Sequence, residues 1–281
     1  MKSLDVKRID AHQHFWKFDS TKDSWITDDM AIIRKDFFPG DLKPILQKNG
    51  FDGCVAVQAS QSEEETNFLI DLARQNEFIK AVVGWIDLQA DDSKERMEHY
   101  KTASIVKGFR HVLQGELQRD LMLQPKFKRG IAGLEQFGFT YDLLIFPDQL
   151  IFSRELVAAF PNQKFVIDHI AKPDIKRKEK AQWRNDMEAI AEHPNVYCKV
   201  SGMVTEADWK AWQKEDFRPY VDVVLNAFGT DRIMFGSDWP VCLVAASYEE
   251  MLGIVKDYFS SFSTHEQQQF FGLNATRFYN L

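Results

Sequence analysis

The sequence predicts an α/β protein that folds as one (β/α)8 barrel, the TIM-barrel architecture, in a single domain over residues 1–281. Short segments rich in Val, Ile, Phe and Tyr recur eight times, about 35 residues apart, which is the length of a strand–loop–helix–loop unit. Helical signals lie between these segments, and the composition does not change along the chain. Eight strands that alternate with helices around one core follow from these observations.

The expected strands and helices follow one another in a regular order. The segments expected to form strands are 8–14, 53–59, 81–87, 105–112, 139–145, 164–169, 196–200 and 232–238. Between the second and third, Ser62 and Glu65 form a capping box that predicts a helix start. A helical repeat of apolar residues over 127–134 ends at Gly138, and a later amphipathic stretch ends before Gly229.

An open, doubly wound sheet is the alternative architecture. That fold would require a glycine-rich phosphate loop after the first strand, where this chain has His12-Gln13-His14. Two long connections, 15–38 and 202–217, instead suit a barrel, because both would extend over the C-terminal face on which barrel active sites are built.

Charge and composition exclude several classes of function. The chain has 35 Lys and Arg against 42 Asp and Glu, a net charge of −7, and an acidic balance argues against nucleic acid as a partner. The three cysteines form no C-x-x-C pair, so a zinc ribbon or a thioredoxin-type motif is not expected. The N-terminus resembles no signal peptide, and no apolar run approaches the length of a membrane span. These features predict a reduced, cytoplasmic protein with no membrane association.

Polar residues lie at the ends of the apolar runs, and this is the strongest functional signal in the sequence. Barrel strands end at one mouth, so these side chains are expected to converge there. They are His12 and His14, Gln58, Asp87, Arg110 and His111, Asp142, His169, Lys199 and Asp238.

Three of these residues are histidines that can act together. His12 and His14 are two residues apart, so on a strand they point to the same side. Such a pair can bind a divalent metal ion or donate hydrogen bonds to one substrate oxygen. His169 is a candidate third imidazole, and Asp238, a carboxylate at the end of a buried strand, suits a general base that acts on water. Asp10 can orient an imidazole or serve as a structural hydrogen-bonding group.

Arg110, His111 and Lys199 add positive charge to the same mouth and are candidates for substrate recognition. Adjacent strand residues face opposite ways, so Arg110 and His111 do not both face the lumen of a regular strand. The alternative for Lys199 is a structural ion pair with Asp142 or Asp238. Aromatic residues that either wall the pocket or pack in the core are Trp16, Trp25, Trp209 and Trp239.

Several motifs resemble those of the amidohydrolase superfamily, across almost the whole chain. They are Asp10-Ala11-His12-Gln13-His14-Phe15-Trp16, Val83-Gly84-Trp85-Ile86-Asp87, Lys107-Gly108-Phe109-Arg110-His111, Asp168-His169-Ile170-Ala171-Lys172-Pro173, Lys199-Val200-Ser201-Gly202, Phe235-Gly236-Ser237-Asp238-Trp239-Pro240 and the C-terminal Asn274-Ala275-Thr276-Arg277-Phe278-Tyr279. Within the superfamily the chain is similar to the lactonase branch, which contains hydrolases of L-fuconolactone, L-rhamnonolactone and pyrone-dicarboxylate lactone.

The resemblance implies a reaction centre of His12, His14, His169 and Asp238. It also implies that Arg110, His111 and Lys199 contact substrate. Superfamily members with two metals have a bridging carbamylated lysine on the fourth strand and histidines on two successive later strands. Here the fourth strand carries Arg110-His111, and the fifth offers Asp142 but no histidine. The expected cofactor is therefore one divalent ion, zinc before others, held by the four reaction-centre residues, or no metal at all.

The resulting hypothesis is a cytoplasmic hydrolase that opens the ring of a small-molecule sugar lactone in carbohydrate catabolism. Asp238 would act as the general base while His12, His14 and His169 polarise the carbonyl, directly or through one metal ion. Trp16 and Trp25 are included as candidate substrate contacts. The rival hypotheses are a metal-dependent, non-oxidative decarboxylase of a small aromatic acid and a barrel that binds a small ligand without catalysis. The sequence is compatible with a homo-oligomer.

Overall fold

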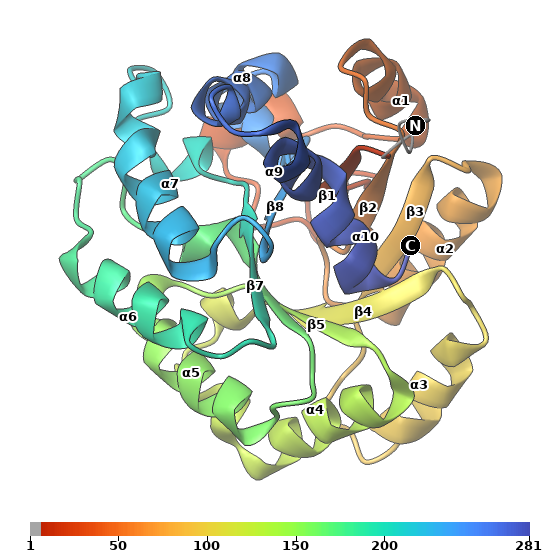
Figure 1. Ribbon diagram of the computed structural model, residues 1–281. Helices are drawn as coiled ribbons and strands as arrows, with labels where there is room; N and C mark the ends of the chain where they lie inside the picture. The colour runs from red at the N-terminus through yellow and green to blue at the C-terminus, as the bar shows by residue number, and fades with distance from the viewer. Residues whose placement is uncertain (1–6) are drawn as a thin grey trace, which may run out of the picture.

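Eight parallel strands pair in sequence order and curl into a nearly closed barrel, which Figure 1 shows for the computed structural model. The structure describes residues 7–281. The strands are β1 (Ile9–Gln13), β2 (Gly53–Val57), β3 (Ile79–Gly84), β4 (Val106–His111), β5 (Thr140–Leu143), β6 (Phe165–Ile167), β7 (Val196–Val200) and β8 (Ile233–Phe235). The predicted (β/α)8 architecture is confirmed.

Helices form the outer layer around the strands, except that α10 lies across one end of the barrel (Figure 1). They are α1 (Pro39–Lys48), α2 (Glu63–Gln75), α3 (Ser93–Lys101), α4 (Pro125–Phe137), α5 (Leu150–Ala159), α6 (Ala181–Ala191), α7 (Lys214–Phe228), α8 (Tyr248–Phe259), α9 (Thr264–Gln268) and α10 (Asn274–Tyr279). The expected capping box is present, because the Ser62 hydroxyl accepts the Glu65 amide at the start of α2. Gly138 ends α4 in the left-handed conformation that its sequence position predicts.

Two apolar layers hold the barrel together. The larger cluster lies between the strands and the surrounding helices, and includes Leu69 of α2 and Ile131 of α4. A second cluster joins inward-facing strand residues such as Val55 and Val83 to Phe278 and Tyr279 of α10. Helix α10 therefore packs against the barrel interior, as a closing helix. None of the helices within residues 7–281 combines the length and the hydropathy that a bilayer-spanning segment requires.

Seven of the eight strands end one to three residues earlier than the sequence predicts, and two of these ends position residues of the site. Strand β6 ends at Ile167 rather than at residue 169, and β8 ends at Phe235 rather than at residue 238. The reason is that the backbone leaves the extended region just beyond these ends, where His169 and Asp238 have φ values of 52° and 57°. These left-handed conformations place both side chains at the mouth of the barrel rather than on a regular strand.

The barrel closes between β8 and β1 through a few backbone contacts instead of a full ladder. The Asp238 amide donates to the His12 carbonyl oxygen at 2.8 Å, and the His14 amide donates to the Trp239 carbonyl oxygen at 2.7 Å. A parallel bridge joins Gln13 and Trp239. Barrel closure therefore brings the residues on either side of the β1–β8 seam within hydrogen-bonding distance.

Candidate active site

A cavity of about 440 Å³ opens where the strands end. Five of the residues expected at the reaction centre or in substrate contact line it: His14, Trp25, Arg110, His169 and Asp238, with Trp25 at the exposed edge. The remaining lining residues come mainly from segments that follow the strands, as in other barrels of this architecture.

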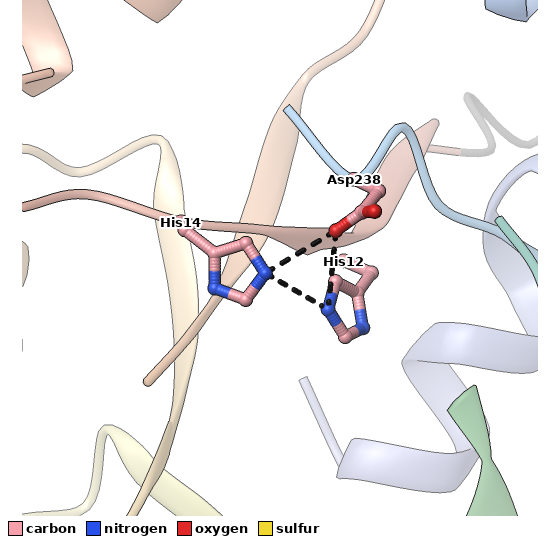
Figure 2. A group of neighbouring side chains, drawn as sticks. All are labelled: His12, His14 and Asp238. Carbon is pink, nitrogen blue, oxygen red and sulfur yellow. Dashed lines mark hydrogen bonds and ion pairs between the residues drawn. The ribbon is translucent and has the colours of Figure 1, made fainter. Parts of the chain in front are cut away.

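His12, His14 and Asp238 form a compact cluster (Figure 2). His14 and Asp238 line the cavity, and His12 is fully buried behind them. The Asp238 Oδ1 atom lies 3.3 Å from His14 Nε2 and 3.8 Å from His12 Nε2. The two imidazole Nε2 atoms are 3.2 Å apart. His169 joins the cluster from the end of β6, with its Nε2 atom 3.9 Å from the same carboxylate oxygen. The structure thus brings together all four residues that the sequence assigns to the reaction centre.

Contacts on the far side of each ring fix how the imidazoles face the cluster. His14 Nδ1 lies 2.8 Å from the Val57 carbonyl oxygen, which can only accept a hydrogen bond. Nδ1 therefore carries the proton, and in the neutral ring Nε2 presents a lone pair toward Asp238. His169 Nδ1 lies 2.9 Å from the Ser201 hydroxyl, which leaves its Nε2 facing the same carboxylate.

Two glycines make room for these rings. A Cβ atom at Gly202, whose φ is +60°, would lie 2.6 Å from His169 Nδ1. A Cβ atom at Gly236 would lie 2.6 Å from the His12 Cβ atom. Both distances are too short for a side chain, so glycine at each position permits the imidazole to occupy its place.

A buried network of charged side chains contacts the Nδ1 side of the His12 ring. The Lys199 ammonium lies 3.1 Å from His12 Nδ1 and 3.0 Å from Asp168 Oδ1. Asp168 also accepts from Arg110 Nη1 at 3.0 Å and lies 3.3 Å from His12 Nδ1. The second carboxylate that contacts Lys199 is that of Asp142, which also accepts a hydrogen bond from the Tyr279 hydroxyl at 2.9 Å. The network extends from the cavity to α10.

Three candidate substrate contacts do not line the cavity. Lys199 is fully buried in the charge network, so the structural ion pair with Asp142 is present. His111 turns away from the lumen, because its Nε2 atom lies 2.7 Å from Glu116 and its ring packs against Phe127 of α4. Arg110 is thus the member of the Arg110-His111 pair that faces the cavity. Trp16 is also absent from the lining and packs against Trp25 and Phe37.

Sequence reasoning did not assign functional roles to several residues at the site. Asp168 directly precedes His169 at a strand end, which is the same signal that identified Asp238. The rule that adjacent strand residues alternate hides it, because the chain leaves the strand here and both residues turn toward the cluster. Lys172 and Glu206 also line the cavity, but they lie in loops, where no periodic pattern marks them.

Burial and charge set the protonation of the cluster. Burial, together with the nearby Lys199 ammonium, holds the pKa of His12 well below its usual range. Burial lowers the pKa of His169 to about 4. Burial alone would raise the pKa of Asp238, but the His169 ring and the contacts with His14 and His12 outweigh it and hold this pKa below its usual value. Near neutral pH the cluster therefore combines a carboxylate with His12 and His169 as neutral imidazoles.

The donor set fits one metal ion. His12, His14 and Asp238 each offer a ligand atom, and all these atoms lie within 4.8 Å of one another; His12, Asp168 and His169 form a second such group. His14 Nε2 lies 3.3 Å from the Asp238 carboxylate, and a neutral His14 ring would direct its lone pair at this carboxylate, an arrangement that a bound cation would stabilise. A metal-binding histidine commonly donates its other N–H to a backbone carbonyl, as His14 does here.

Comparison with known proteins finds similarity over nearly the whole chain. The amidohydrolase family model matches residues 9–281. An L-fucono-1,5-lactonase from Burkholderia multivorans is 38% identical over an alignment of 289 positions, which covers 99% of this chain and 97% of that protein. An L-fucono-1,5-lactonase from Burkholderia ambifaria is 34% identical over 281 residues, which cover 98% of this chain and 96% of that protein.

A solved structure extends the similarity to the whole fold. A crystal structure of an amidohydrolase from Burkholderia multivorans with bound zinc superimposes with a TM-score of 0.94 at 38% identity. The match covers 98% of this chain and 99% of the other. The family match and the relatives that span both chains show that this protein belongs to the amidohydrolase family.

Proposed function

We propose that this protein hydrolyses the internal ester of a sugar lactone, with Asp238 as the general base. The two relatives more than 30% identical over nearly the full chain are both L-fucono-1,5-lactonases, which supports a lactone of this kind as the substrate. The observation that carries the proposal is the position of Asp238, whose Oδ1 atom lies 3.3–3.9 Å from nitrogen atoms of three imidazoles.

Asp238 suits proton transfer in both halves of the reaction. Water attacks the lactone carbonyl carbon while the Asp238 carboxylate takes one of the water protons. The C–O bond to the ring oxygen then breaks, and Asp238 returns the proton to this oxygen, which becomes a hydroxyl group. The product is one hydroxy acid, and a positioned base of this kind typically contributes a factor of about 10²–10⁴ to the rate.

The imidazoles orient the carbonyl group for this attack. His12, His14 and His169 are the residues that would hold one metal ion together with Asp238, and we propose zinc. Tetrahedral zinc separates its ligand atoms by roughly 3.3 Å, close to the 3.2 Å and 3.3 Å that separate His14 Nε2 from His12 and Asp238. When bound, such an ion polarises the carbonyl oxygen as a Lewis acid.

Arg110 and Lys199 act in this proposal through the residues that they hold. Both cations contact His12 and Asp168, so they fix the His12 ring in the cluster. We therefore propose a positioning role for them in place of the direct substrate contact expected from the sequence.

A hydrolysis screen tests the proposal. The purified protein is assayed with a pH indicator against sugar lactones and pyrone acids, before and after exhaustive chelation, with metal content measured in parallel. We expect acid release from neutral sugar lactones, loss of activity with loss of the ion, and recovery when zinc is restored.

Other outcomes would contradict the proposal. Activity that survives verified metal removal would eliminate the metal from the proposal. Release of carbon dioxide from a small aromatic acid, without ring opening, would favour a decarboxylase. Ligand-induced stabilisation without product across the panel would favour a binding protein.

A further inference from the structure

An ion pair forms part of the cavity wall beside the reaction centre. Lys172 Nζ lies 3.4 Å from Glu206 Oε1, and the two side chains keep 18% and 20% of their surface exposed. Both residues line the cavity that contains His169 and Asp238. Lys172 follows His169 at the end of a left-handed segment, and Glu206 comes from the loop after β7.

Local hydrogen bonds hold this part of the wall in place. The Thr205 hydroxyl donates to the Gly202 carbonyl oxygen at 2.7 Å and lies 3.3 Å from Glu206 Oε1. The Trp209 indole N–H donates to the Thr205 carbonyl oxygen at 2.8 Å. The Glu206 carbonyl oxygen accepts the Lys176 amide at 3.0 Å, which ties the loop after β7 to the loop after β6. The carboxylate and the indole are thus preorganised on one wall.

The cavity is balanced in charge. Its lining contains three Lys or Arg side chains, and each already has a carboxylate partner. Arg110 contacts Asp168 at 3.0 Å, Lys172 contacts Glu206 at 3.4 Å, and Lys22, at the exposed rim, lies 3.8 Å from Glu64. The Asp238 carboxylate adds negative charge to the same space. A ligand that carries carboxylates would have to compete with these partners for each cation, whereas a neutral ligand needs no free cation.

We propose that the Lys172–Glu206 pair selects a neutral, polyhydroxylated lactone by binding its ring hydroxyl groups. The carboxylate accepts hydrogen bonds from hydroxyl groups and the ammonium donates to them, while the Trp209 indole supplies an apolar surface beside them. Hydrogen bonds to charged groups contribute more than those between neutral groups, and a ligand without the hydroxyl groups cannot form them. The inference rests on the proposed lactonase function and names the feature of the substrate that this wall recognises.

Steady-state kinetics on two neutral lactones test the inference. The first is L-fucono-1,5-lactone, and the second is δ-valerolactone, which has the same ring size and no hydroxyl groups. We expect Glu206→Gln and Lys172→Met to raise KM for the hydroxylated lactone by about 10- to 100-fold, with hydrolysis of δ-valerolactone unchanged within about two-fold.

The chain offers a matched control. Asp208 and Lys176 form an ion pair of 3.6 Å between the same two loops, and neither residue lines this cavity. Asp208→Asn therefore breaks a similar contact without touching the proposed recognition site. Equal KM values for the hydroxylated lactone in wild type, Glu206→Gln and Asp208→Asn would overturn the inference while the lactonase function stands.

A binding measurement separates this inference from the hydrolysis itself. Calorimetric titration uses 1,5-anhydro-L-fucitol, which carries the ring hydroxyl groups but no carbonyl group. We expect wild type and Asp208→Asn to bind it at least about 10-fold more tightly than Glu206→Gln does. If 1,5-anhydro-L-fucitol binds in this way but the wild type does not hydrolyse the lactone, the proposed lactonase function is wrong and the recognition site stands. Equal binding by all three proteins, or no binding by wild type, would overturn the recognition site.

Discussion

The backbone amide of Asp238 donates a hydrogen bond to the carbonyl oxygen of His12 at 2.8 Å, across the seam between β8 and β1. This contact closes the barrel, and it also holds the general-base candidate beside the first imidazole. Asp10 reinforces the seam, because its carboxylate accepts the amides of Ser237 at 2.9 Å and His12 at 3.2 Å. Asp10 therefore holds backbone segments together rather than orienting an imidazole ring.

Gly202→Ala is expected to reduce activity by displacing His169. The new Cβ atom would lie 2.6 Å from His169 Nδ1, so the ring must move away from Asp238. Gly138→Ala is the control, because Gly138 also has positive φ but lies at the end of α4, far from the cluster in the chain. Each substitution costs about 1–2 kcal/mol of backbone strain in thermal or denaturant unfolding. Only Gly202→Ala should also lower kcat/KM; equal kinetics in the two variants would contradict this role.

Lys199→Met is expected to destabilise the fold. Lys199 is fully buried between Asp142 and Asp168, so its removal leaves two buried carboxylates without this cation. We expect a loss of about 3–5 kcal/mol in the free energy of unfolding, measured with denaturant. Lys214→Met removes a half-exposed partner of Asp257 and should cost at most about 1 kcal/mol. Similar losses in the two variants would show that the buried network contributes little.

Glu65 is expected to make stability depend on pH. Burial raises the pKa of Glu65 to about 7 from its usual 4.5, although its carboxylate accepts the Ala59 and Ser60 amides. Between these pH values the folded protein retains a proton that the unfolded chain releases, so the contribution of Glu65 to stability falls as pH rises.

Glu65→Gln should remove this dependence. The melting temperature of wild type should fall relative to that of Glu65→Gln as pH increases from 4.5 to 7. Glu64→Gln, at the exposed neighbouring position, controls for the loss of one negative charge from the helix. A constant difference in melting temperature between wild type and Glu65→Gln across this range would reject the shifted pKa.

The sequence predicts the regular parts of this protein better than its turns. Runs rich in Val, Ile, Phe and Tyr, about 35 residues apart, identify all eight strands, and the polar strand ends point to the cluster of His12, His14, His169 and Asp238. These predictions succeed because a barrel brings every strand end to one mouth.

The remaining features depend on contacts that local patterns do not encode. Strand periodicity separates Arg110 from His111 but does not say which faces inward; the packing of His111 against Phe127 decides it. Lys199 can be fully buried because its ammonium pairs with Asp142 and Asp168, which come from two other strand segments. Lys172 and Glu206 lie in loops, where side-chain direction follows no period.

Asp238→Asn provides the most direct test of the account, with L-fucono-1,5-lactone as substrate and zinc content and thermal unfolding measured on the same samples. Asparagine keeps the shape of the side chain but cannot accept the water proton. We predict that kcat falls by about 10²–10⁴-fold while the protein stays folded. Near-normal turnover by a folded Asp238→Asn variant would contradict the role of Asp238 as the general base.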